Sequence, residues 1–464
     1  MKRTRRRPHA AALAAGCLAA CWLVAGGLVA GGMPAGGRPA PIVAPDRAED
    51  APDFSRAALA DFAWRAFVAL DWPAADPSHG RGEPDRARTL GDSGKRVWET
   101  FKSGYELLPV DDAGRRIEPT PWESEAGPNP CGADADNRRR TIASFEPFAD
   151  FNQPSFAAGE PANPLVARNG AYTRYEIHVD AAEFSTFAAH GWSGGLNLPD
   201  PGHPARLPVG SIAVKAAWRP LTAADPPSAR TRAYVERAAI VDVGKTLAAG
   251  HVVCAETEVA LVGLHIAIKT ASRPQWVWMS FEHIDNVPPA GEGAAREPDA
   301  RDDGVPYAYF DPAEPKRLWP PFGAAGTQPV DRTHPPALDP APMQVVRRHP
   351  IDPSAMAANR AYWSAAGVKD TVWARYMLVA VQWPTSREPP GPENDGGYFP
   401  GGPTAPGARD ESYKSVAAPE ENLTNTTMET YLQDRPSSCM ACHQAVSNAR
   451  GDDFVGTLAR VSTQ

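Results

Sequence analysis

The spacing of apolar residues near the start of the chain is that of a helix. Ser55 precedes apolar positions that recur every three or four residues as far as Leu70. This pattern predicts a helix with one apolar face and with Ser55 as its N-cap. Residues 96–108 repeat the spacing, so we expect a second helix there.

The middle of the chain has the period of a strand. Tyr175, Ile177 and Val179 alternate with polar residues, and other segments show the same alternation or a long β-compatible run. The predicted strands cover residues 172–179, 212–218, 254–270, 275–284 and 376–381. The four residues 271–274 join two of these runs as a hairpin. We therefore expect an α+β fold, in which an antiparallel sheet is flanked by helices.

Proline is unusually frequent, with 50 residues among 464, and this content implies long loops. The prolines gather in residues 38–53, 287–353 and 384–406. The first group lies close to the N-terminus, where we expect a tether. The second has aromatic residues scattered through it, which indicates a loop packed on the protein surface and not a free linker.

The first 37 residues resemble an export signal. Five Lys and Arg residues precede an uncharged stretch over residues 10–37 that is rich in Ala, Gly, Leu and Val. The later fate of this segment stays open. It could be cut near Ala35 or Ala40, lipidated at Cys21, or kept as a membrane anchor that tethers the protein.

The chain is acidic. Its formal net charge is −8 at pH 7, and removal of residues 1–37, which hold five basic residues and no acidic one, leaves −13. Such a surface argues against nucleic acid or an anionic membrane surface as the partner.

The clearest chemical signal lies near the C-terminus, in Cys439-Met440-Ala441-Cys442-His443. This is the spacing by which haem is attached covalently. The two thiols bond to the two vinyl groups of one haem c, and the adjacent imidazole binds the iron as axial ligand. The alternative is zinc bound by Cys439, Cys442 and His443. Structural zinc usually needs a second close pair of ligands, and the sequence has no second CxxC or HxxxH.

The export signal and the haem motif support each other, because haem is attached to bacterial c-type cytochromes outside the cytoplasm. Around the motif we expect short helices over residues 427–432 and 454–461, and a motif helix capped by Ser437-Ser438. The chain then divides into an export signal or membrane anchor (1–37), a Pro-rich tether (38–53), an α+β body (54–410) and a helical haem-attachment segment (411–464).

Two cysteines remain after the signal and the haem motif have taken four of the six. Cys131 and Cys254 could pair as a disulfide in an oxidising compartment, or could stay as separate buried thiols. The sequence leaves both possibilities open.

The sixth ligand of the iron must come from upstream, because no Met or His follows His443. Met428 is the nearest candidate for the distal position, although a Met in this place can equally fill a gap in the core. His265 and His283 lie in or beside apolar strands and are the other candidates. His178 alternates onto the polar side of its strand and is a weaker one.

The chain resembles c-type cytochromes, and in particular a set of large, exported, mono-haem cytochrome c family proteins of bacteria. The resemblance rests on the haem motif together with Phe62-Ala63-Trp64, Gln275-Trp276-Val277-Trp278 and Asn425-Thr426-Thr427-Met428-Glu429-Thr430. It implies that Cys439, Cys442 and His443 hold the haem, and it implies no particular activity.

These observations predict a periplasmic mono-haem cytochrome that acts in electron transfer or redox chemistry, with a redox partner protein or a small molecule as its counterpart. Two alternatives remain. One is a haem-dependent oxidoreductase with an open iron, and the other is a sensor in which the iron binds a small ligand without turnover. The size of the body argues against a simple electron carrier.

Overall fold

The computed structural model describes residues 55–76, 78, 80–132, 140–152, 164–200, 205–271, 273, 276–289, 304–314, 329–383, 423–433, 439, 443 and 453. The predicted export signal and tether, Cys442, the predicted cap at Ser437-Ser438 and the predicted helix over residues 454–461 lie outside these residues.

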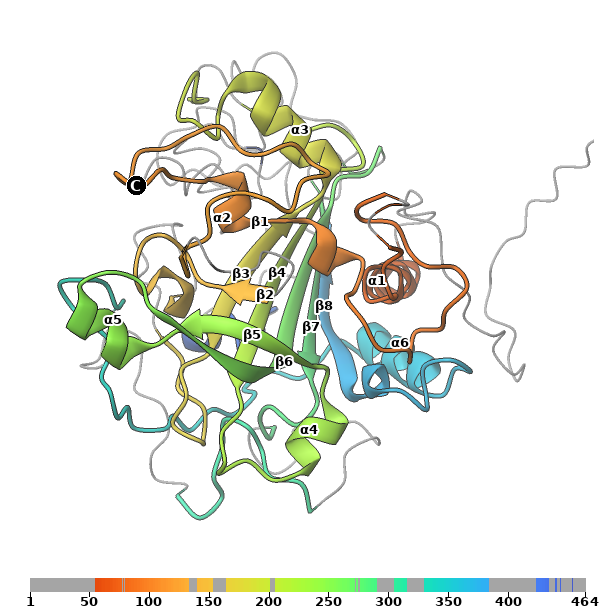
Figure 1. Cartoon of the computed structure of the whole chain (residues 1–464). Coiled ribbons are helices and arrows are strands. Elements are labelled where there is room, and N and C mark those ends of the chain that lie inside the picture. The colour runs from red at the N-terminus through yellow and green to blue at the C-terminus, as the bar shows by residue number, and fades with distance from the viewer. Residues whose placement is uncertain are drawn as a thin grey trace, which may run out of the picture. The chain divides into compact units, whose positions relative to one another are not determined.

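Eight strands of the described chain form one sheet (Figure 1). They are β1 (Lys102–Ser103), β2 (Arg140–Ile142), β3 (Arg174–Val179), β4 (Ile212–Pro220), β5 (Val235–Val241), β6 (Cys254–Ile268), β7 (Val277–His283) and β8 (Tyr376–Gln382). Their order is β1-β3-β4-β6-β5-β2, while β7 pairs with the second half of β6 and β8 pairs with β7. The predicted strands and the β6–β7 hairpin are confirmed. The sheet is mixed and not purely antiparallel, because β2 runs parallel to β5.

Helices of varied length surround this sheet, so the α+β class is confirmed. They are α1 (Arg56–Leu70), α2 (Gly104–Leu107), α3 (Ala181–His190), α4 (Ser228–Arg232), α5 (Val243–Ala249) and α6 (Pro353–Trp363), with 3₁₀ turns η2 (Trp98–Thr100), η3 (Ala149–Phe151), η5 (Val372–Arg375) and η7 (Thr430–Leu432).

The sheet curls so that β2 returns toward β3. The guanidinium of Arg140 on β2 pairs with the carboxylate of Glu176 on β3, although β4, β6 and β5 separate these two strands in the sheet order. The twist that strands impose on a sheet allows such a partial closure. The inside of the curl therefore brings together side chains from distant parts of the sequence.

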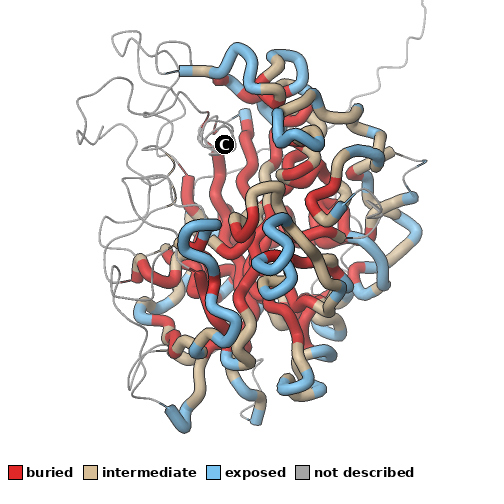
Figure 2. Tube along the Cα trace, turned by 60° about the vertical axis from the view of Figure 1, so that its left-hand side comes forward, coloured by how far each residue is buried: buried red, intermediate tan, exposed pale blue. Residues whose placement is uncertain are grey.

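The curl gives the sheet two different faces. On the inner face, the ring of Phe281 packs against Phe67 of α1, with 4.3 Å between ring centroids, and against Trp64, with 5.3 Å. Because successive side chains of a strand point to opposite faces, His265 and Trp278 lie on the outer face. Figure 2 shows the strands buried along most of their length, so both faces are covered.

Helix α1 begins where the sequence predicts. The Ser55 hydroxyl accepts a hydrogen bond from the backbone N–H of Ala58 (3.2 Å), which satisfies one of the unpaired N–H groups at the helix start. Asp71 follows the last turn, and its buried carboxylate accepts a hydrogen bond from the indole of Trp98 (2.9 Å).

The predicted helix over residues 96–108 is wrong. Turn η2, strand β1 and the short helix α2 follow one another there. Phe101 is extended, with φ −63° and ψ 163°, and a capping box between Ser103 and Glu106 begins α2 anew. The apolar side chains pack against the curl of the sheet from extended and turn conformations, which override the helical spacing.

The described parts of the Pro-rich loop over residues 287–353 pack against the body, as predicted. Tyr309 and Val345 are fully buried, and the backbone N–H of Val345 donates to the carbonyl of Tyr309 (2.8 Å).

Within the described residues, no helix is both long and apolar enough to cross a membrane.

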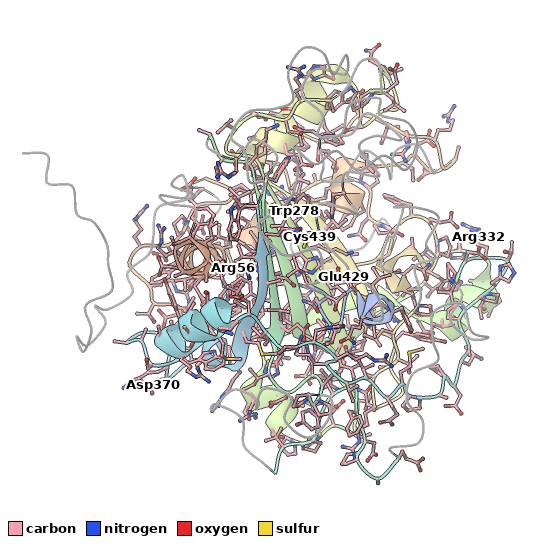
Figure 3. All side chains as sticks on the ribbon, turned by 180° about the vertical axis from the view of Figure 1, so that it is seen from behind. Arg56, Trp278, Arg332, Asp370, Glu429 and Cys439 are labelled. Carbon is pink, nitrogen blue, oxygen red and sulfur yellow. A yellow bond between two sulfur atoms is a disulfide. The ribbon has the colours of Figure 1, made fainter. Side chains whose placement is uncertain are left out.

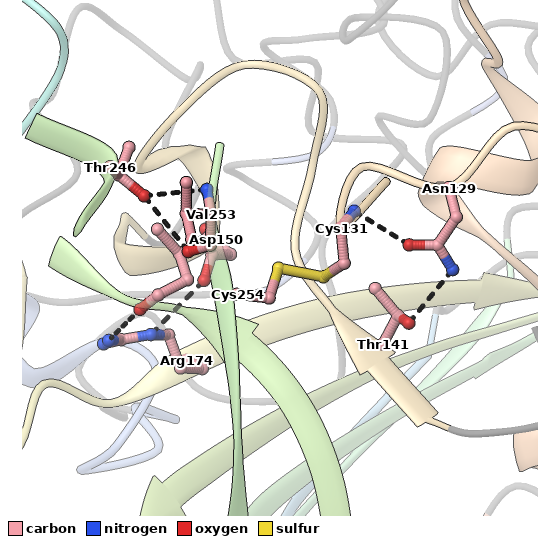
Figure 4. The surroundings of a disulfide bond; sticks show 9 residues. Asn129, Cys131, Thr141, Asp150, Arg174, Thr246, Val253 and Cys254 are labelled. Carbon is pink, nitrogen blue, oxygen red and sulfur yellow. Dashed lines mark hydrogen bonds and ion pairs between the residues drawn. A yellow bond between two sulfur atoms is a disulfide. The ribbon is translucent and has the colours of Figure 1, made fainter. Parts of the chain in front are cut away.

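Cys131 and Cys254 form a disulfide (Figure 4). The bridge joins the start of β6 to the segment that leads toward β2. Beside it, the Asn129 side chain accepts a hydrogen bond from the backbone N–H of Cys131 (2.8 Å) and donates one to the Thr141 hydroxyl on β2 (3.2 Å). The disulfide therefore fastens one side of the curl.

Replacement of Cys131 and Cys254 together by Ser should lower the free energy of unfolding by about 2–5 kcal/mol, because the bridge spans 123 residues of sequence and restricts the unfolded chain. Urea unfolding of the oxidised protein measures this loss. Dithiothreitol should bring the wild-type midpoint down to that of the variant. A wild-type midpoint that does not respond to reductant would contradict the pairing.

Candidate functional site

The described residues of the C-terminal segment, which are 423–433, 439, 443 and 453, lie along the outer face of the sheet. Figure 3 shows Trp278, Cys439 and Glu429 placed one after another along this face. Outward-facing residues of β6 mark the order, spaced by about 6.6 Å. Thr427 contacts Gly263, and Glu429 contacts His265. His443 contacts Trp278, which is the strand partner of Ala267, and Asp453 contacts Lys269. We call the end of this face near Gly263 the lower end and the end near Lys269 the upper end.

A set of buried polar contacts fixes the lower part of this segment. The Asn425 side chain donates to the Ser280 hydroxyl on β7 (3.1 Å). The fully buried carboxylate of Glu282 accepts hydrogen bonds from the Thr426 hydroxyl (2.7 Å) and backbone N–H. The same carboxylate pairs with Arg347 (2.5 Å). Because buried charges need such partners, these contacts hold Asn425 and Thr426 against β7.

These contacts explain why the predicted helix over residues 427–432 is only partly formed. Only η7, at Thr430–Leu432, is helical, as a 3₁₀ turn. The Asn425 Oδ1 accepts from the backbone N–H of Thr427 (3.0 Å), whereas η7 itself begins after Glu429 without a side-chain cap. The residues before η7 instead take conformations that direct their side chains into the sheet.

Met428 lies at the lower end of the outer face. It is buried in an apolar cluster with Tyr175, Ala217 and Val262. A cluster of this kind is the ordinary environment of a core methionine. Cys439 packs against a different cluster at the upper end, so the structure does not bring Met428 together with the motif.

The motif residues lie at the upper end of the outer face. Cys439 and His443 are both in helical conformation, and both are partly buried. The imidazole of His443 lies against the indole of Trp278, with 4.0 Å between ring centroids and 35° between ring planes. Cys439 contacts an apolar cluster that contains Leu107, Leu108, Val179, Phe184, Phe187, Trp192, Ala205, Leu207, Ala267, Trp276 and Trp278.

A buried ion pair anchors the chain beyond the motif. The ammonium of Lys269, at the end of β6, pairs with the carboxylate of Asp453, and both are almost fully buried. Asp453 also accepts a hydrogen bond from the backbone N–H of Leu207 (2.6 Å). Burial raises the pKa of Asp453 and lowers the pKa of Lys269, while each partner opposes the shift of the other.

These surroundings fit a covalent haem. The cluster around Cys439 supplies the apolar, aromatic walls that a haem plane packs against. The indole Nε1 of Trp278 is buried and, among the described residues, has no hydrogen-bond acceptor, so a donor remains for an acidic substituent of a bound group. The part of the chain that the structure describes contains no cluster of three His, Cys, Asp or Glu for a metal ion.

His265 is the histidine closest to this arrangement among the candidates. It lies one outward step along β6 from Ala267, which is opposite Trp278. Its Nε2 lies 3.5 Å from the carboxylate of Glu429. Burial opposes ionisation of Glu429, yet the charges of His265 and Lys215 and hydrogen bonds leave its pKa below the usual range. The pair can hold the His265 ring in one orientation.

The other two candidate histidines use their rings elsewhere. The Nε2 of His283 lies 3.1 Å from the backbone carbonyl of Arg232, and its Nδ1 accepts from the backbone N–H of Asp285 (3.1 Å). His178 is buried on the inner face, where its ring contacts Glu176 and the Phe101 carbonyl. Neither ring faces the motif.

Sequence reasoning missed Glu282, Lys269 and Asp453 as parts of this site. A single charged residue carries no signal of which distant residue it will pair with.

The chain matches no protein-family model, and no curated protein and no solved structure matches it.

Replacement of Lys269 by Met should destabilise the protein by about 3–5 kcal/mol at pH 7, because the carboxylate of Asp453 stays buried without its cation. The folded protein then binds a proton at Asp453 more tightly than the unfolded chain does, so the deficit should shrink as the pH falls. Urea unfolding between pH 4 and pH 8 measures both effects.

The double variant Lys269→Met with Asp453→Leu is the control, and it should regain most of the lost stability because no charge is left buried. A single variant as stable as the wild type would mean that the two residues do not meet.

Proposed function

We propose that the protein is an exported mono-haem c-type cytochrome with its haem on the outer face of the sheet. Cys439 and Cys442 would hold the haem and His443 would bind the iron. The observation that carries the proposal is the position of the motif, with Cys439 against an apolar cluster and His443 against Trp278. The disulfide agrees with an oxidising compartment such as the periplasm, and a membrane tether through residues 1–37 remains part of the proposal.

The residues around the motif have separate tasks in this proposal. A bound haem supplies one-electron chemistry at its iron. Trp278 would restrain the plane of the His443 ring. Residues that orient a metal ligand in this way tune the properties of the metal. The apolar cluster keeps water away from one side of the site, and the Lys269–Asp453 pair holds the chain that leaves it. In this proposal the protein acts in electron transfer or redox chemistry with a partner protein or a small molecule.

We propose that His265, in preference to Met428, would supply the second protein ligand of the iron. His265 lies about 6.6 Å along β6 from the level of Trp278, whereas Met428 packs at the level of Val262, five residues or about 16.5 Å from that level. Glu429 beside His265 resembles the carboxylates that orient the histidine ligands of metals. A closed iron of this kind favours electron transfer over the two alternatives with an open iron.

Replacement of Cys439 and Cys442 together by Ala should abolish the covalent haem, because no thiol remains to bond to the vinyl groups. The pyridine haemochrome spectrum of denatured protein, made in cells that mature c-type cytochromes, measures this. The variant with Cys131 and Cys254 replaced by Ser is the matched control and should keep its haem. Zinc in place of iron in the wild type, by elemental analysis, would contradict the proposal.

Replacement of His265 by Ala should change the ferric spectrum from low-spin to high-spin and allow rapid binding of carbon monoxide to the reduced protein, since the sixth position would open. Met428→Leu is the control with a similar volume and should leave the spectrum unchanged. If Met428→Leu removes a sulfur-to-iron band in the far red, the methionine is the ligand. A wild type that is already high-spin would favour catalysis or sensing.

A further inference from the structure

A polar pocket of about 400 Å³ lies inside the curl, on the face of the sheet opposite the haem motif. Residues of β2, β3, β5 and β6 line it together with the segment from Lys95 to Glu106. Its volume is in the range of pockets that bind small molecules. Neither the haem nor its attachment uses this space, because the pocket residues of β3 alternate with those that face the C-terminal segment.

The other carboxylates that line the pocket each have a cation. They form ion pairs of Arg81 with Glu106 (3.1 Å), Lys95 with Glu125 (3.8 Å) and Arg237 with Glu256 (3.2 Å), and the buried ammonium of Lys102 also pairs with Glu106 (3.4 Å). Arg237 and Glu256 are well exposed to solvent, so the pocket opens to the surface at this side. These groups therefore contribute no excess negative charge.

The inner end of the pocket holds more carboxyl groups than the guanidinium at its centre can pair. Arg140 lies between the rings of Trp98 and Trp218, at 5.2 and 4.7 Å from their centroids, and pairs with both Glu99 and Glu176. Burial opposes ionisation of Glu176, but Arg140 and the neighbouring His178 hold its pKa below the usual range.

Glu236 is the third carboxyl of the inner end. Among the described residues, no Lys, Arg or His forms an ion pair with it. The Tyr234 hydroxyl lies 2.8 Å from an oxygen of Glu236 and 2.8 Å from an oxygen of Glu99. Arg96 lies over the Tyr234 ring, 4.9 Å from its centroid.

This geometry requires an extra proton. Each of the two O···O contacts needs a hydrogen, and the Tyr234 hydroxyl supplies one of them. One of the two carboxyls must hold the other. Burial, with a contribution from the charge of Glu236, raises the pKa of Glu99 against the opposing charge of Arg140. We therefore place this proton on Glu99.

We propose that this pocket binds a small organic cation, an alkylammonium or a guanidinium, whose charge sits beside Glu236 and replaces the proton held by Glu99. One positive charge enters as one proton leaves to solvent, so the charge of the inner end is unchanged. Arg140, fixed between two tryptophans, limits the depth that a cation can reach. Carboxylates accept charge-assisted hydrogen bonds from both cation types.

Isothermal titration of the haem-loaded protein with agmatine, in phosphate and in Tris at pH 7, tests the proposal. Agmatine should bind with release of about one proton, which the difference between the two buffers measures. Its affinity should rise with pH, because a higher pH favours loss of this proton. The neutral 1,4-butanediol and the anionic succinate should bind at least about tenfold more weakly.

Glu236→Gln should weaken agmatine binding at least about tenfold and remove the proton release. Glu258→Gln, on β6 at an exposed ion pair outside the pocket, is the matched control and should change neither. Absence of agmatine binding in the wild type, binding without proton release, or tighter binding of succinate would each overturn the proposal. The wild-type pH series decides the question even if Glu236→Gln fails to fold.

Discussion

The buried carboxylate of Glu282 is the contact on which the position of the C-terminal segment depends. It joins three parts of the chain that are far apart in sequence, because it sits on β7, pairs with Arg347 of the Pro-rich loop and accepts two hydrogen bonds from Thr426. A carboxylate with no exposed surface must keep these partners. Only twelve residues separate Thr426 from Cys439, so this contact also limits where the motif can lie.

The alternation of side chains along single strands gives one sheet two chemical environments. On β3, Tyr175 and Val179 face the C-terminal segment, while Glu176 faces the polar pocket inside the curl. The proposed haem and the proposed cation site are therefore separated by the thickness of a sheet. They share a rigid frame, held at one side by the Cys131–Cys254 disulfide.

Local signals in the sequence predicted much of the fold. The cap at Ser55, the alternation in β3 and β4 and the β6–β7 hairpin depend on neighbouring residues, and the structure contains all of them. The helix over residues 96–108 failed because tertiary packing outweighs apolar spacing there. Strand β2 has only three residues and a parallel partner, so no alternation of apolar and polar residues predicts it.

The candidate sites divide in the same way. Covalent attachment requires neighbours in sequence, so the motif at Cys439 could be recognised, whereas its contact with Trp278 depends on the docking of the whole segment. The inner pocket was not predicted at all. Arg140, Glu99 and Glu236 are distant in sequence and meet only because the sheet curls.

The central claim is that the haem lies against Trp278 on the outer face. Nuclear magnetic resonance of protein labelled with ¹⁵N-tryptophan tests it directly, because an unpaired electron at the iron shifts or broadens nearby signals. Oxidation should strongly perturb the indole signals of Trp278 and Trp276, assigned by Trp→Phe variants, and should leave those of Trp64 and Trp373 on the inner face nearly unchanged. Perturbed signals from Trp64 and Trp373 with an unmoved Trp278 would contradict the account.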